Sequence, residues 1–327
     1  MPDTGLGGQL VVAKETTFGT RVVPNRSFEF NTESLKESRQ RINARGIRAG
    51  RMFQRGSRSV QTTRDGGGDI VMDVPTQGFG PILDQLHGNA VTPVVQGATI
   101  AYKQTHDIGN TSPRGKSLSV QVGRPDTGGI VRPFDYLGLK VTSLRLAVDT
   151  GGLLVATIGT DSREEKTDQT LVTPSYPATL RSFNFTQGSL LVDTVAAAGI
   201  TSVNMELTAP MKTDRFFLNS AGLKAEPLSN DYAGATVNVD AEFQDLTLYS
   251  RYRSNTKAAL DLLFTGEQIA TGFNETLRVL MDYCVQDGDT PNIDGPDVLN
   301  QSIPFVVQDG ATLPPVRIEY TSLDAAL

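Results

Sequence analysis

The residue types that most often carry catalysis or metal binding are scarce in this chain. It has two histidines, His87 and His106, and a single cysteine, Cys284. His87 ends a predicted helix, His106 lies in a polar segment, and neither has a second ligand at a metal-like spacing. Alternation places Cys284 on the opposite strand face from Met281 and Tyr283, with no histidine nearby in sequence to activate it. The sequence therefore predicts no metal site, no catalytic residue and no enzymatic activity. An enzyme whose site the sequence does not reveal is the outside alternative.

Two short motifs resemble ligand-binding loops only in part. The Gly-Leu-Gly-Gly run at 5–8 lacks the preceding strand and following helix of a dinucleotide-binding loop. Segment 287–298 offers Asp287 and Asp289 at calcium-ligand positions, but it ends in Val298 where a calcium loop needs a glutamate. We expect a solvated turn there and no cofactor.

Charge is distributed very unevenly along the chain. Residues 36–64 carry nine basic side chains and one acid, Glu37, so this segment is +8 and the rest of the chain is −14, within a total of −6. The basic residues are Lys36, Arg39, Arg41, Arg45, Arg48, Arg51, Arg55, Arg58 and Arg64. A strongly cationic segment on an acidic body favours binding to another copy of the same chain.

Three interpretations of this segment remain open. It could bind nucleic-acid phosphates, but Phe53 is its only aromatic residue, whereas single-strand binders interleave several. It could be a solvated loop. It could dock on the acidic surface of another copy, where the planar arginine side chain pairs with carboxylates.

An internal repeat favours docking. Residues 35–49 (LKESRQRINARGIRA) align with 211–225 (MKTDRFFLNSAGLKA) at a constant offset of 176, with five identities. The identical pairs are Lys36/Lys212, Arg39/Arg215, Asn43/Asn219, Gly46/Gly222 and Ala49/Ala225. The second copy has lost most of the charge but keeps a turn with an apolar residue (Ile47, Leu223) and a cation (Arg48, Lys224). We expect both segments to contact other subunits. The residues are Arg39, Arg41, Arg45, Ile47, Arg48, Arg51, Arg55, Lys212, Arg215, Leu223 and Lys224.

The elements around these segments are predicted to be mainly strands. Apolar residues alternate at 118–122, 144–148, 203–207, 237–243, 277–285 and 316–320, which is typical of antiparallel sheets with one buried face. Helical spacing appears at 82–88 and 259–266, each ending at a glycine. The similar order of elements predicts two related β-domains, 1–170 and 171–327, joined near the polar stretch 161–170. We expect segment 36–57 to be poorly ordered in a free subunit. No secretory signal or bilayer-spanning run is readable.

The sequence also resembles a known family. KETTFGT (14–20), ESLK (33–36) and RINARGIRAGR (41–51) are similar to the start of the tail tube (major tail) proteins of long-tailed bacteriophages. The later NSAG and DYAG segments are similar as well. The resemblance implies a β-sandwich or half-barrel with one short flanking helix per domain. Subunits would close into a ring-shaped β-barrel, the rings would stack, and loop 36–57 would reach the neighbouring ring.

The resemblance further implies a structural role in the virion tail, with assembly in the host cytoplasm. The implied partners are other copies of the chain and the tape measure, distal tail and terminator proteins, with no membrane. DNA would pass through an acidic lumen without specific binding. Because the chain carries two domains, a ring of three chains is expected, or six if the second half is an outward decoration. The alternative function is a DNA-binding virion protein that uses the arginine-rich loop.

Overall fold

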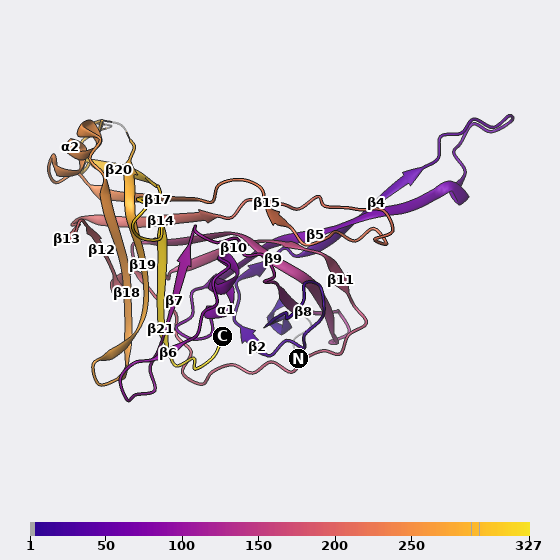
Figure 1. Cartoon of the computed structure of the whole chain (residues 1–327), viewed down its shortest axis with the longest axis horizontal. Coiled ribbons are helices and arrows are strands. Elements are labelled where there is room, and N and C mark those ends of the chain that lie inside the picture. Colours follow the sequence, from indigo (N-terminus) through magenta and orange to yellow (C-terminus); the bar gives the residue numbers. More distant parts are fainter. Residues whose placement is uncertain (1–3, 289, 294) are drawn as a thin grey trace.

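The chain is built almost entirely of antiparallel strands. The structure, a computed structural model, describes residues 4–288, 290–293 and 295–327. Nineteen strands form one continuous network of ladders, and two short strands pair separately. Figure 1 shows a body made of two regions side by side, from which one long hairpin projects. The mainly β fold class with few short helices is confirmed, and no barrel closes within the described part of the single chain.

The first half of the chain (residues 1–170) contains eleven of these strands. They are β1 (Gln9–Lys14), β2 (Arg26–Phe28), β3 (Thr32–Glu33), β4 (Lys36–Asn43), β5 (Ser59–Asp73), β6 (Val94–Val95), β7 (Tyr102–Ile108), β8 (Leu118–Pro125), β9 (Val131–Asp149), β10 (Val155–Ser162) and β11 (Glu164–Lys166). Helix α1 (Gly80–Leu83) continues into a 3-10 turn at Asp84–Leu86, which confirms the helix predicted at 82–88.

The second half (residues 171–327) contains the other ten. They are β12 (Gly188–Val192), β13 (Val195–Ala196), β14 (Ile200–Thr208), β15 (Met211–Lys212), β16 (Leu228–Ser229), β17 (Gly234–Glu242), β18 (Ala258–Ala270), β19 (Phe273–Gln286), β20 (Asn300–Val307) and β21 (Val316–Ser322). Helix α2 (Thr247–Ser254) follows β17, as α1 follows β5.

The two halves pair their strands in the same order. In the first half the ladders run β1–β8–β9–β10–β5, and β11 also pairs with β9. In the second half they run β12–β18–β19–β20–β17, and β21 also pairs with β19. Each half therefore has five strands paired in corresponding order and a sixth strand paired with the third strand of that order, β9 or β19. A short helix follows β5 in the first half and β17 in the second. The pair β6–β7, inserted after α1, has no counterpart in the second half and joins β21.

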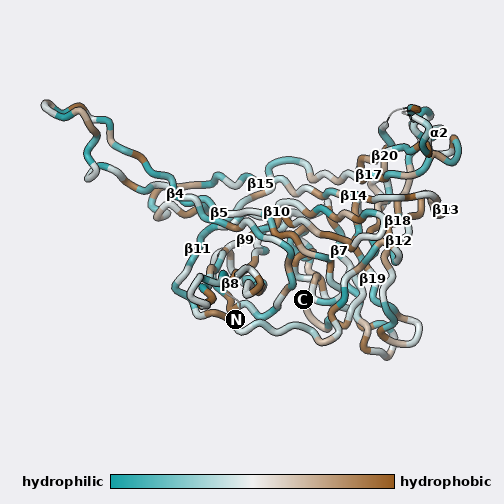
Figure 2. Tube along the Cα trace, turned by 180° about the vertical axis from the view of Figure 1, so that it is seen from behind, coloured by the Kyte–Doolittle hydropathy of each residue, from teal (hydrophilic) through white to brown (hydrophobic). Residues whose placement is uncertain are grey.

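Two ladders join the halves, β7–β21 and β9–β14, and the second of them makes one continuous six-stranded sheet. Strand β9 pairs with β10 on one edge and with β14 on the other, over seven residue pairs from Ser202↔Asp149 to Thr208↔Ser143. The resulting sheet runs β5–β10–β9–β14–β17–β20 across both halves. Its inner face is part of a hydrophobic core that extends through the whole body. In Figure 2 brown hydrophobic stretches run through the strands of this body.

The predicted alternation places most core residues correctly. Leu144, Leu146 and Val148 of β9 are buried, as are Val203, Met205 and Leu207 of β14. At the end of β19 the alternation fails, because Met281 and Cys284 both lie in the core while Tyr283 between them is only partly buried. The cause is a bulge, since the register with β18 shifts between Ala258↔Cys284 and Leu260↔Met281. The prediction that Cys284 lies on the opposite face from Met281 is therefore wrong.

The helix predicted at 259–266 is also wrong. These residues belong to β18, whose alternate residues Ala258, Leu260, Leu262 and Phe264 are buried. A short apolar run fits a buried strand as well as a helix, and pairing with β12 and β19 decides between them. The actual helix, α2, ends at Asn255 in a left-handed conformation (φ 52°).

The segment expected to be poorly ordered is partly a strand. Lys36–Asn43 form β4, which pairs with β5 from Lys36↔Gly67 to Asn43↔Ser59. These ladder hydrogen bonds order the base of the hairpin without a hydrophobic face, so the expectation is wrong for this part. Among the described residues no helix is long and apolar enough to cross a bilayer.

Candidate assembly surfaces

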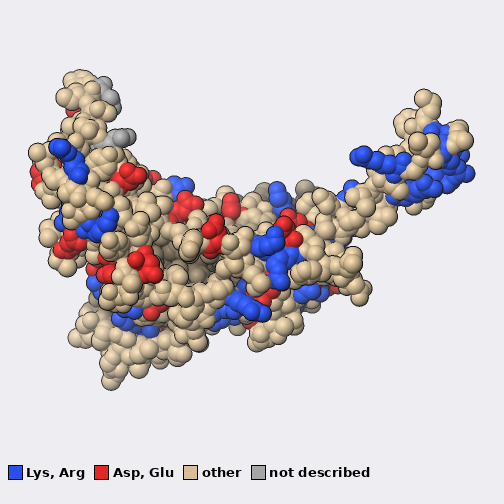
Figure 3. All heavy atoms as spheres, turned by 45° about the horizontal axis from the view of Figure 1, so that its top comes forward, with Lys and Arg blue, Asp and Glu red and all other residues tan. Residues whose placement is uncertain are grey.

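The arm (residues 36–64) is the hairpin that projects from the body. Near its base, Arg39 pairs with Glu37 at 2.5 Å and Arg64 with Glu164 at 3.3 Å. Beyond β4 every residue from 44 to 58 is exposed. Arg45, Arg48, Arg51, Arg55 and Arg58 make no ion pair with any described residue. Figure 3 shows these basic groups gathered in blue at the end of the arm.

The arm also exposes large apolar side chains. Ile47, Met52 and Phe53 are 102%, 100% and 91% exposed, respectively. Exposed apolar residues interleaved with unpaired cations are typical of a contact surface awaiting its partner. The geometry is thus suited to docking, and the intermolecular roles of Arg39, Arg41, Arg45, Ile47, Arg48, Arg51 and Arg55 stay a prediction.

The second loop (residues 209–233) connects β14 to β17 and folds back onto the first half of its own chain. Lys224 has no exposed surface and donates to Asp65 Oδ1 at 2.7 Å and Asp161 Oδ1 at 2.5 Å. Lys140 of the first half, equally buried, pairs with Glu226 of the loop at 2.8 Å. Sequence reasoning placed Lys224 at a contact between subunits, whereas the structure places it in a contact within the chain.

The other residues predicted in the second loop are more accessible. Lys212 pairs with neighbouring Asp214 at 2.9 Å and is exposed. Arg215 donates to the backbone oxygen of Glu226, and Leu223 is half-buried. Their contacts with other subunits stay a prediction.

Burial at the Lys224 contact changes the titration of its acid partner. Desolvation raises the pKa of Asp161 to about 6, although the ion pair with Lys224 acts in the opposite direction. Asp65, the second partner, has a side chain that is 67% exposed. The ammonium of Lys224 therefore bridges one buried and one exposed carboxylate.

The solvent face of the six-stranded sheet is acidic. Its side chains alternate with the core residues of the same strands, and the register brings them into rows across both halves. From Asp69 to Glu242 this face carries six carboxylates and one cation, Arg145, which donates to Asn204 Oδ1 at 2.7 Å. The carboxylates, called here the acidic face, are Asp69, Asp73, Asp149, Glu206, Asp240 and Glu242.

The two histidines meet in the core, which sequence reasoning missed. Ligand atoms of Asp84, His87 and His106 lie within 4.8 Å of one another, and the three residues are buried. However, Lys14 and Lys116 already hold the Asp84 carboxylate, at 2.6 and 2.8 Å. His87 Nε2 lies 3.1 Å from His106 Nδ1, so the rings share a hydrogen bond. Two ammonium groups beside a single carboxylate oppose a bound cation, and the cluster fits a buried polar network better than a metal centre.

Burial keeps these histidines neutral. It lowers the pKa of His87 to about 4 and that of His106 to about 3. Burial similarly raises the pKa of the Cys284 thiol to about 12, which makes it unreactive at neutral pH.

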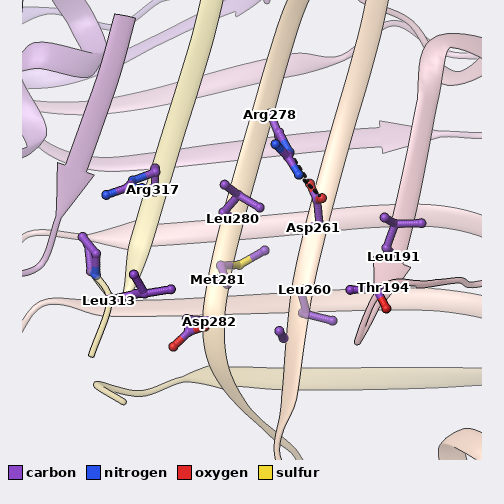
Figure 4. Close-up of a pocket in the computed structure, with 12 residues that line it drawn as sticks. Leu191, Thr194, Leu260, Asp261, Arg278, Leu280, Met281, Asp282, Leu313 and Arg317 are labelled. Atoms are coloured by element: carbon purple, nitrogen blue, oxygen red, sulfur yellow. Dashed lines mark hydrogen bonds and ion pairs between the residues drawn. The ribbon is translucent and has the colours of Figure 1, made fainter. Parts of the chain in front are cut away.

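An apolar cavity of about 230 Å³ lies on the face of strands β12, β18, β19 and β21. Figure 4 shows Leu260, Leu280 and Met281 along its wall. Arg278 is held by Asp261 through hydrogen bonds of 2.9 and 2.7 Å, so its charge is compensated.

The glycine-rich run at 5–8 does not form a dinucleotide-binding loop. Residues 5–7 form a 3-10 turn that leads directly into β1 rather than into a helix. In segment 287–298, residues 289 and 294 lie outside the described residues.

Comparison with known proteins agrees with the geometry. The model of a family described as phage tail tube protein matches residues 5–307, nearly the whole chain. No curated protein matches the sequence significantly.

Proposed function

Because the chain belongs to the phage tail tube protein family, a family of structural proteins of the virion tail, we propose that it self-assembles into stacked rings. The rings form the conduit through which DNA enters the host. Assembly takes place in the host cytoplasm, and the ends of the tube meet the tape measure, distal tail and terminator proteins. DNA passes through the lumen without specific binding.

One observation carries this proposal: the two halves have the same pairing order and are already joined edge to edge through β9 and β14. A ring of tube domains needs one such junction between every two neighbours. The chain contains the first of these junctions, which supports reading 1–170 and 171–327 as two tube domains. Three chains would then supply the six domains of a ring.

The acidic face is proposed as the wall of the lumen. It belongs to the six-stranded sheet that runs through both halves by way of β9 and β14, so joining chains edge to edge would continue this sheet around the ring. Five net negative charges per chain on this face repel the phosphates of DNA. Because the wall repels DNA, the duplex can slide through the lumen without adhering to it.

The arm is proposed to connect subunits. Its unpaired arginines are complementary in charge to the acidic remainder of the chain. Bidentate pairing of arginine with a carboxylate fixes the orientation of the contact and also strengthens it. Pairing an exposed strand edge with another copy also protects it from unwanted association.

Negative-stain microscopy of concentrated, purified protein tests this function. We expect tubes or stacked rings with a continuous lumen. Protein that stays monomeric over a wide range of concentration and ionic strength would contradict it.

The exposed cationic arm also supports a second candidate, a DNA-binding virion protein. Binding of this type would shift labelled duplex DNA at physiological ionic strength and weaken steeply with added salt. We expect no such shift, because the acidic face and the −14 charge outside the arm oppose the approach of DNA.

A further inference from the structure

The second loop is seated in a site formed by the first half of the same chain. Lys224 lies between Asp65 of β5 and Asp161 of β10 and also points to the carbonyl oxygen of Gly66 at 3.4 Å. Arg64 N donates to the carbonyl oxygen of Gly222 at 2.8 Å. The contact therefore has a cationic component and a backbone component.

Glycine is required at one position of this contact. Gly222 has a left-handed φ of +76°, and a Cβ there would collide with the carbonyl oxygen of Thr62. Asn219 and Ala221 also have positive φ, so the segment forms a tight, specific turn. Its shape is adapted to the surface of β5.

The arm carries the same turn sequence without a partner. Residues 43–49 (NARGIRA) are identical to 219–225 (NSAGLKA) at three of seven positions, including Gly46 opposite Gly222, and Arg48 lies opposite Lys224. In the free chain these residues are exposed and Gly46 has no positive φ. The sequence that forms a seated turn in one half does not form the left-handed turn at its glycine in the other, where no surface of the described chain receives it.

The second half has an acidic surface at the end of its strand pair that matches the seat of Lys224. Strands β17 and β20 correspond to β5 and β10, and the matching end of this pair lies at Ala235↔Val307. Just beyond it, Asp231 precedes β17 and Asp309 follows β20. Both aspartates are exposed, and neither forms an ion pair with a described residue.

A cavity of about 400 Å³ lies beside these aspartates. Leu207, Tyr232 and Val307 contribute to its lining together with Asp309. It offers apolar surface for a side chain of the size of Ile47, and two carboxylates for a cation. The second half thus offers carboxylates for the cationic component of the contact, together with an apolar surface beside them.

We propose that segment 43–49 of one copy binds to the second half of an adjacent copy, in the position that segment 219–225 occupies on the first half of its own chain. Arg48 then lies between Asp231 and Asp309, and Ile47 enters the adjoining cavity. On binding, Gly46 adopts the left-handed conformation of Gly222. The inference rests on the proposed self-assembly and adds the site that receives the arm.

Disulfide trapping in the assembled protein tests the contact. The double variant Arg48→Cys, Asp309→Cys should give covalent dimers and longer ladders on non-reducing gels after mild oxidation of tubes. Cys284 is buried and does not interfere. The control pair Arg41→Cys, Asp309→Cys uses an exposed arm residue outside the turn, in the paired part of β4, and should give at least about tenfold less product. Equal products from both pairs, or none from assembled tubes of the first, overturns the proposal.

A charge exchange covers the case in which the cysteine variants do not assemble. Asp309→Arg alone should prevent tube formation, and adding Arg48→Asp should restore it. If neither variant assembles while wild-type tubes form, the site is wrong and the proposed function stands. If the wild-type protein forms no tubes, both proposals fail.

Discussion

At the scale of single residues, the buried charges determine how this chain responds to pH. Lys224 and Asp161 lie between the halves, whereas His87 and His106 lie beside Asp84 within the first half. None of these contacts is readable from the sequence, because the partners are 63 positions apart in the first case and 19 in the histidine pair. No local periodicity encodes such pairs. The arginines of the arm, by contrast, are exposed as their clustering predicts.

Lys224→Met should strongly destabilise the folded chain. Removing one partner of a buried ion pair costs about 3–5 kcal/mol, because the other charge stays buried. Loss of Lys224 raises the pKa of Asp161 further, so the cost is largest above pH 6 and falls as Asp161 takes up a proton at lower pH. Urea denaturation at pH 8 and pH 5 measures both effects. The control Lys212→Met, at an exposed pair, should change the unfolding free energy by less than about 0.5 kcal/mol. Equal midpoints for the two variants would contradict a structural role for Lys224.

The histidine pair should make the chain less stable in mild acid. Their folded-state pKa values are lowered, to about 4 and about 3, from an ordinary value of 6.5. The unfolded chain therefore takes up protons first, and stability is lost as pH falls below 6.5. At pH 5 the loss reaches about 2 kcal/mol per histidine.

Comparing wild type with the double variant His87→Gln, His106→Gln isolates this effect. Protonation of Asp161 stabilises the folded chain in the same pH range, which opposes the effect of the histidines. Because Asp161 is present in both proteins, its contribution cancels in the comparison. The difference in unfolding free energy between pH 7.5 and pH 5 should be larger for wild type. An identical pH dependence would show that the two rings do not contribute.

At the scale of elements, the strands follow from the sequence and the exceptions have local causes. Period-two alternation identifies the core strands because one face of each is buried. It fails in β18, where the apolar run also fits a helix, and at the bulge before Cys284, where an extra residue reverses the face. Helix α2 is missed because TLYSRYRS has no apolar face to reveal it. Of the two candidate surfaces, one could be predicted from the sequence and the other could not. The arm is visible as a charge cluster, whereas the acidic face becomes visible only when the pairing order is known.

Reversing three arm charges should stop assembly without unfolding the subunit. Arg45, Arg48 and Arg51 are exposed, so changing all three to Glu should leave the unfolding free energy within about 1 kcal/mol. Like charges would then face the acidic acceptor, and we expect at least a tenfold loss of polymer in sedimentation assays. The matched variant with three lysines keeps the charge and should still assemble. Tubes of normal length from the glutamate variant would remove the arm from the assembly mechanism.

At the scale of the whole molecule, the repeated pairing order predicts the number of chains in a ring. A closed barrel of a given diameter needs a set number of strands, and therefore of domains. If each chain supplies two domains, a ring that needs six is complete with three chains. We expect threefold symmetry in end-on views and the mass of three chains in native mass spectrometry of a single ring. Six chains per ring would mean that the second half decorates the outside.

The β9–β14 ladder also has a kinetic consequence. In a ring assembled from separate domains, every junction must form by collision, and each association costs translational and rotational entropy. In the proposed ring of three two-domain chains, half of the junctions would form when each chain folds, as intramolecular contacts at a high effective concentration. A ring nucleus then requires three encounters in place of six. Its formation rate should depend on a lower power of protein concentration, so that tubes begin to grow in dilute protein.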